Sequence, residues 1–140
     1  MGWLGVDLDG TIAQWESGQG IDRIGNPIIG ACWRQLLAAI DQGREVRIMT
    51  ARVSTEGHGA EEAQAQRQLI QDWLEAHGLP RLAVTCEKDQ HMEELWDDRA
   101  RQIQMNTGAF VEPRQIRNRL VDEIIGDSAI EARLRQLADF

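Results

Sequence analysis

The sequence predicts an α/β fold: a single Rossmann-like, three-layer domain with a central, mainly parallel sheet, no large cap and a helical C-terminal tail. Short apolar runs of strand length alternate with longer segments whose apolar residues recur every three or four positions. Strand–helix–strand order requires right-handed crossovers, which make neighbouring strands parallel and place helices on the faces of the sheet. Polar residues cluster where several of these strands end, which is where such sheets bind ligands.

The composition and charge of the chain limit the classes of protein to which it can belong. The chain has 140 residues, 42% hydrophobic and 27% charged, which suits one soluble domain with its own core. A net charge of −8 argues against broad attraction to nucleic acid or to an anionic membrane. The segment "MGWLGVDLDG" lacks the basic flank of a signal peptide, and Cys32 and Cys86 lack metal-ligand spacing. We therefore expect two free thiols, a cytoplasmic protein and no membrane span, with a homodimer left open.

The sequence up to Gly43 predicts one strand, one loop and one helix. Residues 3–8, "WLGVDL", are too short for a helix and suit a strand buried on both faces. Residues 13–27 are rich in glycine and polar groups and predict a loop. A helix follows Pro27 and ends near Gly43. Its apolar stripe consists of Ile29, Cys32, Trp33, Leu36, Leu37 and Ile40.

The middle of the chain repeats this order. Residues 45–50 alternate apolar and polar as a strand does, and a glycine-containing loop leads into a helix that ends at Gly78 and Pro80. The stripe of this helix consists of Leu69, Ile70, Trp73 and Leu74. Residues 82–86 predict the next strand. Residues 92–96 are a weaker strand because two glutamates interrupt them, and residues 101–105 are a candidate last strand.

Residues 1–109 should form the catalytic core and residues 110–140 a helical extension of the same domain. Apolar residues four apart in the tail indicate helices, over about residues 113–138. The pair Gly126–Asp127 has two interpretations. It could be a second acidic motif after a strand, or a helix break in which Ser128 and Glu131 form a capping box. The capping box is the preferred interpretation.

The stretch "DLDGT" at residues 7–11 contains the main candidates for a metal-binding and catalytic site. Side chains two apart on an extended chain point the same way, so Asp7 and Asp9 would face one ligand. Carboxylates and a substrate phosphate are the oxygen ligands that Mg²⁺ prefers. Asp7 could then reach a phosphorus atom while Asp9 reaches the bridging oxygen. Gly10 permits a tight exit from the strand, and Thr11 offers hydroxyl and N–H donors to the substrate. The alternative is an ordinary Asp-Gly turn.

These residues resemble the motifs of the haloacid dehalogenase-like (HAD) phosphohydrolases. "VDLDGTIA" is similar to the first motif, and "VRIMTAR" is similar to the second, a strand that ends in Thr or Ser, here Thr50. Lys88 in "CEKDQ" resembles the third motif, and "LWDDRA" resembles the fourth through Asp97 and Asp98. The resemblance covers about residues 3–105, and the first motif is its most specific part.

The resemblance implies a role for each residue. Asp7 would be the nucleophile that takes the phosphoryl group, and Asp9 the acid that protonates the leaving group and later activates water. Thr50 would bind the transferred phosphoryl oxygens, and Lys88 would neutralise charge. Mg²⁺ would be held by Asp7, by the backbone carbonyl of Asp9 and by the acidic pair. In that pair Asp98 aligns best with the direct ligand, and Asp97 with a residue that steadies Lys88 or a metal-bound water.

Several of these residues also have simpler interpretations. Thr50 could merely end a strand, Lys88 could be a solvated loop residue, and Asp97–Asp98 could form a turn paired with Arg99. Arg52 could bind the substrate phosphate or form a surface ion pair.

The intervals between the motifs leave no room for a cap domain, so we expect an open site. A Mg²⁺-dependent phosphatase acting on a nucleotide or a small phosphorylated metabolite is the leading hypothesis. A nucleic-acid-end (3′) phosphatase of the polynucleotide kinase-phosphatase type is the first alternative, and it requires a basic strip near the site. The candidates for that strip are Arg34, Arg44, Arg47, Arg52 and Arg67. A non-catalytic Mg²⁺-binding interaction module is the second alternative.

Overall fold

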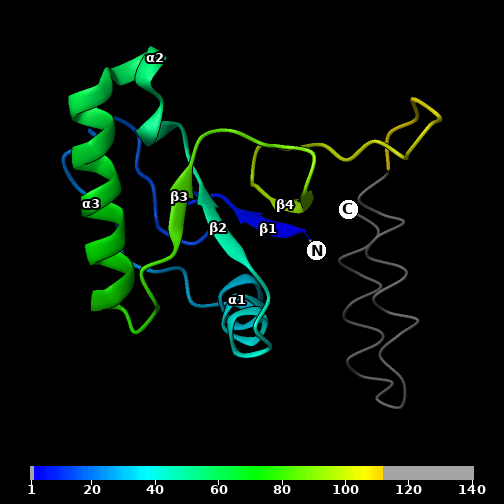
Figure 1. Cartoon of the computed structure of the whole chain (residues 1–140), viewed down its shortest axis with the longest axis horizontal. Coiled ribbons are helices and arrows are strands. Elements are labelled where there is room, and N and C mark those ends of the chain that lie inside the picture. Colours follow the sequence, from blue (N-terminus) through cyan, green and yellow to red (C-terminus); the bar gives the residue numbers. More distant parts are fainter. Residues whose placement is uncertain (1, 112–140) are drawn as a thin grey trace. The chain divides into compact units, whose positions relative to one another are not determined.

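The computed structural model of this chain describes residues 2–111 and contains a parallel, four-stranded sheet. The strand order is β3-β2-β1-β4, and every neighbouring pair runs in parallel (Figure 1). The strands are β1 (Trp3–Val6), β2 (Val46–Met49), β3 (Ala83–Thr85) and β4 (Met92–Trp96). The α/β class and the parallel central sheet are therefore confirmed, including the weak strand at 92–96. Contacts divide the chain into two compact units, one ending at Asp98 and one beginning at Arg99.

Connections that contain helices join the first three strands of the first unit. The segment between β1 and β2 holds one helix, and the segment between β2 and β3 holds three helical elements. These elements are α1 (Ala31–Asp41), the 3₁₀ turn η1 (Ala51–Val53), α2 (Thr55–His58) and α3 (Ala60–Ala76). The expected absence of a cap insertion in these two connections agrees with the structure. The helix predicted to follow Pro27 begins only at Ala31, and Ile29 is 68% exposed rather than part of its buried stripe.

The helices α1 and α3 pack on one face of the sheet. Both crossovers step in the same direction, from β1 to β2 and from β2 to β3, so right-handed connections place both helices on the same side. An edge-to-face contact between Trp33 of α1 and Trp73 of α3, with ring centroids 6.1 Å apart, joins them. Leu4 and Val6 of β1 are fully buried in the core beneath them. The sequence predicts a helix layer on each face, and the described residues provide only this one.

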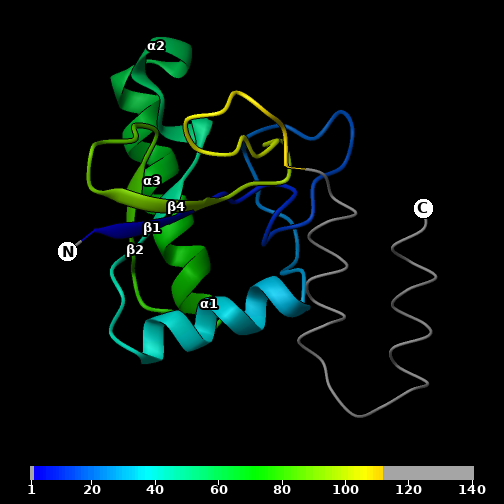
Figure 2. The same cartoon turned by 90° about the vertical axis from the view of Figure 1, so that its right-hand side faces the viewer.

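A non-helical segment lies over part of the other face. Trp3 is fully buried outside the main core cluster, and the guanidinium of Arg47 lies 4.4 Å from its ring. The indole Nε1–H of Trp3 donates to Asp89 at 2.9 Å, in the connection between β3 and β4. Figure 2 shows this connection leading into β4, beside β1. All four residues of β1 are buried, as predicted for a strand covered on both faces.

The second unit is described only for residues 99–111, which form a small hairpin-like turn. Ile103 and Phe110 make an isolated antiparallel bridge, and Asn106 and Gly108 in the turn have positive φ angles of 67° and 71°. The prediction of a strand over residues 101–105 is therefore wrong, because these residues pair only locally, at a single bridge. The expected helices at 113–138 and the Gly126–Asp127 motif lie outside the described residues.

Two further expectations concern cysteines and membranes. Cys32 and Cys86 are both free thiols, as expected, and each is half-buried rather than fully buried. In the part of the chain that the structure describes, no helix combines the length and apolarity needed to cross a membrane.

Candidate metal and phosphate site

Three of the predicted aspartates meet at the carboxyl ends of two neighbouring strands. Val6 of β1 is in register with Trp96 of β4, and the N–H of Asp7 donates to the carbonyl of Trp96 at 2.9 Å. The parallel ladder therefore places Asp7 beside the segment that carries Asp97 and Asp98. One carboxylate oxygen from each of these three residues lies within 4.8 Å of the others. The sequence prediction that the first and last motifs converge is consistent with this placement.

Thr11 and Gly10 shape this aspartate cluster, which consists of Asp7, Asp97 and Asp98. The Thr11 hydroxyl lies 3.2 Å from Asp7 Oδ2 and 3.0 Å from Asp98 Oδ1, and it accepts the N–H of Asp98 at 3.2 Å. Gly10 has a φ of +85°, and a Cβ on it would lie 2.8 Å from Asp98 Oδ2. Glycine is therefore favoured here by the backbone conformation of the turn, and any Cβ would displace the Asp98 carboxylate from its present position.

The surroundings of Asp7 favour its protonated form. Burial, followed by a hydrogen bond with Asp98 and the charge of Asp97, raises the pKa of Asp7 from 3.8 to about 7. The N–H of Leu8 and the hydroxyl of Thr11 act in the opposite direction and do not offset these effects. Without a cation, the cluster thus holds a proton near neutral pH.

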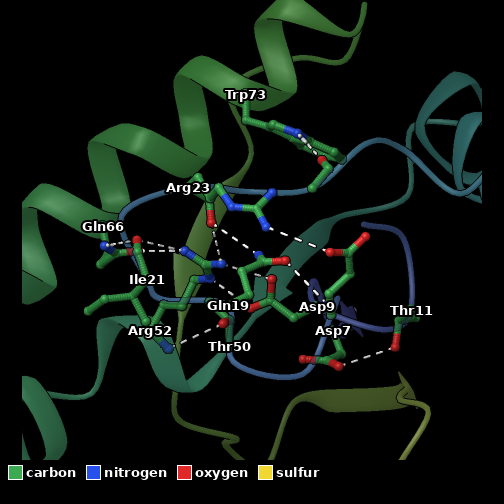
Figure 3. A network of polar contacts seen from close by, with 12 residues as sticks. Asp7, Asp9, Thr11, Gln19, Ile21, Arg23, Thr50, Arg52, Gln66 and Trp73 are labelled. Carbon is green, nitrogen blue, oxygen red and sulfur yellow. Dashed lines mark hydrogen bonds and ion pairs between the residues drawn. The ribbon is translucent and has the colours of Figure 1, made fainter. Parts of the chain in front are cut away.

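Asp9 faces a different partner, although it is only two residues from Asp7. Its carboxylate is bound by Arg52 through two parallel hydrogen bonds, Nε to Oδ2 at 2.7 Å and Nη2 to Oδ1 at 2.9 Å (Figure 3). The Asp9 side chain is 21% exposed and that of Arg52 only 3%. The two carboxylates of the Asp-x-Asp motif are therefore separated into an acidic environment and an ion pair.

Arg52 is placed by the turn that follows β2. Thr50 is buried, and its hydroxyl oxygen caps η1 by accepting the N–H of Arg52 at 3.2 Å. The remaining guanidinium N–H groups donate to the carbonyls of Ile21 and Arg23 and to Gln66 Oε1, at 2.9–3.0 Å. All five N–H groups are thus used, and the side chain is buried. This conformation leaves no guanidinium N–H group for the predicted contact with a substrate phosphate. The burial of Arg52 also does not fit the alternative prediction of a surface ion pair.

Lys88 is not joined to the aspartate cluster. Its side chain is exposed in the connection between β3 and β4, and within residues 2–111 no hydrogen bond or ion pair links it to a carboxylate. The next residue, Asp89, is held by Trp3 at the start of β1, whereas Asp7 follows the end of that strand. The role of Lys88 stays a prediction.

The arginines proposed for a basic strip are mostly engaged elsewhere. Arg44 pairs with Glu94 at 3.2 Å, and Arg47 pairs with Glu45 at 3.4 Å and with Asp89 at 3.5 Å. Arg44 precedes β2 and so lies near the amino ends of the strands, whereas the aspartate cluster lies at their carboxyl ends. These pairs place acids beside the cations that a polynucleotide would need.

The cluster suits a hard divalent cation. Mg²⁺ binds oxygen ligands, and three carboxylates from two chain segments can each offer one at close range. Burial, the hydrogen bond with Asp98 and the charge of Asp97 raise the pKa of Asp7, and the positive charge of such an ion would offset them. Asp7, Asp97 and Asp98 therefore fit Mg²⁺ by their donor chemistry.

Sequence reasoning missed the residues that surround Asp9. Gln66 is only 3% exposed, and it accepts from Arg52 while its own Nε2 donates to the carbonyl of Ile21 at 2.7 Å. A glutamine that interrupts the apolar stripe of α3 at a core position is the one signal that could have pointed to it.

Comparison of this chain with protein-family models, with curated proteins and with solved structures gave no match.

Proposed function

We propose that this protein is a Mg²⁺-dependent phosphomonoester hydrolase of the HAD-like type that acts through an aspartyl-phosphate on Asp7. The observation that carries the proposal is the meeting of Asp7, Asp97 and Asp98, with Thr11 between them, at the carboxyl end of a parallel sheet. The order of the motifs along the sequence supports the same family. The placement of these residues at strand ends supports the same chemistry.

Each residue would act through its own chemistry. A carboxylate oxygen of Asp7 attacks phosphorus while the bond from phosphorus to the ester oxygen breaks. Asp9 forms its ion pair with Arg52 as a carboxylate, so it would first take up a proton, from solvent or from the phosphate group of the substrate, and then give it to that leaving oxygen. As a carboxylate again, it would take a proton from the water that hydrolyses the aspartyl-phosphate. Thr11 orients Asp7 through its hydroxyl. Mg²⁺, when bound by the aspartate cluster, would offset the negative charge of the carboxylates and of the phosphoryl group.

The substrate we propose is a nucleotide or another small phosphorylated metabolite. The connections between β1 and β2 and between β2 and β3 hold only loops and single-layer helical elements with no further strand, which supports an open site without a cap insertion there. The ion pairs of Arg44 and Arg47 with acids favour a small substrate over a nucleic-acid end.

The first experiment is hydrolysis of p-nitrophenyl phosphate with Mg²⁺, comparing the wild type with Asp7→Asn. We expect Mg²⁺-dependent turnover that falls by at least about 1,000-fold in the variant, because an amide cannot act as the nucleophile. Asp72→Asn is the matched control. Asp72 pairs with Arg81 on the exposed side of α3, so this variant should keep wild-type turnover. Turnover that survives Asp7→Asn would contradict the mechanism. Mg²⁺ binding without turnover on a panel of nucleotides would favour the interaction module.

A further inference from the structure

We infer that this site selects a phosphoryl group bonded to a weakly basic oxygen, as in a phosphoanhydride or an acyl phosphate, because Arg52 holds Asp9 as a carboxylate. The inference rests on the proposed function and narrows its substrates. A weakly basic oxygen departs as an anion, whereas the oxygen of an alkyl ester needs a proton as its bond to phosphorus breaks. The choice of substrate therefore depends on whether the site can supply that proton.

The ion pair between Arg52 and Asp9 opposes a proton on Asp9. The guanidinium donates to both carboxylate oxygens, at 2.7 and 2.9 Å, so a proton on either oxygen weakens one of two charge-assisted hydrogen bonds. Because Arg52 is only 3% exposed, water cannot readily replace the weakened bond. A neutral Asp9 would also leave the buried guanidinium without its counter-charge.

The guanidinium of Arg52 is itself fixed opposite Asp9. Its Nη1 donates to the carbonyl of Ile21 and to Gln66, and its Nη2 donates to the carbonyl of Arg23, as Figure 3 shows. Movement of the guanidinium away from Asp9 would break these hydrogen bonds in a buried place, which is costly. The fold as a whole therefore maintains the ion pair, and a change of one rotamer does not release Asp9.

The aspartate cluster cannot replace Asp9 as the proton donor. Its carboxylates would hold Mg²⁺ in ionised form, and Asp7 must also be ionised to attack phosphorus. Lys88 is exposed, and within residues 2–111 no hydrogen bond or ion pair links it to these carboxylates. A leaving oxygen that departs as an anion makes no demand on any of these groups.

An ionised Asp9 suits the second half of the reaction. In the first half, a carboxylate oxygen of Asp7 bonds to phosphorus, and the electron pair of the broken bond stays on the leaving oxygen. Water then attacks phosphorus, the bond from phosphorus to Asp7 breaks, and Asp9 takes the proton of that water and passes it to solvent. The fork leaves about two lone-pair positions of Asp9 free, and the side chain is 21% exposed.

The test compares kcat/KM for p-nitrophenyl phosphate and for phenyl phosphate in the wild type with Mg²⁺. The two esters have nearly the same shape, and p-nitrophenolate is the weaker base. General acid catalysis contributes about 100- to 10,000-fold where it operates, so without it p-nitrophenyl phosphate should be favoured by at least about 100-fold. The ratio kcat/KM is used because it reports the attack of Asp7 and not the later hydrolysis of the aspartyl-phosphate.

Two further substrate pairs distinguish a phosphoanhydride from an acyl phosphate. The terminal phosphoryl group of ADP leaves from a phosphate oxygen, whereas that of AMP leaves from a ribose oxygen. Acetyl phosphate releases acetate, whereas glycerol phosphate releases an alcohol. Faster release of inorganic phosphate from ADP than from AMP would identify a phosphoanhydride, and the same preference for acetyl phosphate, after subtraction of its uncatalysed hydrolysis, would identify an acyl phosphate. A preference in neither pair would overturn the inference.

Arg52→Gln tests the cause of this selectivity. Glutamine removes the charge and the fork, so Asp9 can take up a proton, and the ratio between the two phenyl esters should fall about 10-fold. This ratio does not depend on the fraction of folded protein, and the wild-type ratio keeps the test decisive if the variant does not fold. Arg47→Gln is the matched control and should keep the wild-type ratio, because Arg47 pairs with Glu45 and Asp89.

The outcomes separate this inference from the proposed function. The expected wild-type ratio, together with its fall in Arg52→Gln, supports the inference. A smaller wild-type ratio, or an unchanged ratio in folded Arg52→Gln, would overturn it; if Asp7→Asn still abolishes turnover of both esters, the role of Asp7 stays intact. A wild-type chain without turnover of either ester would overturn the proposed function and this inference together.

Discussion

Asp7 and Asp9 stand two residues apart in the sequence, yet their electrostatic surroundings are opposite. Burial, together with the neighbouring carboxylates of Asp98 and Asp97, raises the pKa of Asp7 to about 7. Asp9 is neutralised by a buried arginine that binds both of its oxygens. These surroundings place the proton on Asp7 and an ionised carboxylate at Asp9, whereas a nucleophile must be ionised and a proton donor protonated; the proposed roles therefore need a cation that displaces the proton of Asp7.

At this scale we predict a pH-dependent stabilisation by Asp7→Asn. Folding raises the pKa of Asp7 from 3.8 to about 7, so the folded state binds more protons than the unfolded state between these values. The unfolding free energy of the metal-free wild type therefore falls as pH rises through this window. Asparagine does not titrate. Its advantage over the wild type should be about 1–2 kcal/mol larger at pH 8 than at pH 5.5.

Urea unfolding in EDTA at the two pH values measures this difference. Asp72→Asn is the control, because Asp72 lies on the exposed side of α3 and is not part of the cluster. An equal effect of Asp7→Asn at pH 5.5 and at pH 8 would contradict the electrostatic account of Asp7.

At the scale of elements, the turn after β1 determines whether the aspartate cluster can form. Gly10 has a left-handed backbone conformation and lies against Asp98, so two separate constraints act on one position. Gly43, which follows α1, shares the first constraint, with a φ of +78°, but a Cβ there would meet nothing within 4 Å. The two glycines therefore form a matched pair.

We predict that Gly10→Ala weakens Mg²⁺ binding and that Gly43→Ala does not. Both variants should lose about 1 kcal/mol of unfolding free energy, because alanine is disfavoured at positive φ. Only Gly10→Ala also pushes against Asp98, which should lower Mg²⁺ affinity about 10-fold and add to the loss of stability. Isothermal titration with Mg²⁺ and urea unfolding provide both quantities. Equal Mg²⁺ affinities in the two variants would show that Asp98 does not need this close approach.

The elements also show what sequence patterns can and cannot predict. Trp3–Val6 and Val46–Met49 were predictable because buried parallel strands are short and apolar. Residues 92–96 form a strand despite Glu93 and Glu94, because β4 lies at one end of the strand order and both glutamates are exposed there. The ion pair between Asp9 and Arg52 was not predictable, since residues 43 positions apart meet only after the fold has formed.

At the scale of the whole molecule, the net charge of −8 raises the cost of gathering three acids in one place. We predict that Mg²⁺ stabilises the wild type and does so more at pH 8 than at pH 6. Below a pKa of about 7, a proton on Asp7 competes with the cation. At 100 times its Kd, the ion should add about 2.7 kcal/mol.

Thermal unfolding with Mg²⁺ or with EDTA at the two pH values provides the measurement. Asp98→Asn should reduce the shift in Tm, whereas Asp89→Asn should retain it, because Asp89 is bound to Trp3 outside the aspartate cluster. A shift in Tm of the same size at both pH values would mean that Asp7 is not part of the Mg²⁺ site.

The pairing of β4 with β1 has a consequence for local unfolding. Among residues 2–111, Asp97 and Asp98 are brought to Asp7 by this ladder, which ends with the hydrogen bond from Asp7 to Trp96, and Thr11 adds two hydrogen bonds to Asp98. If β4 detaches briefly, the carboxylates separate while α1, α3 and the other strands can stay in place. Repulsion among the acids favours this opening, and a cation bound between them opposes it. Occupancy of the site would therefore control how often this edge of the sheet is exposed to solvent.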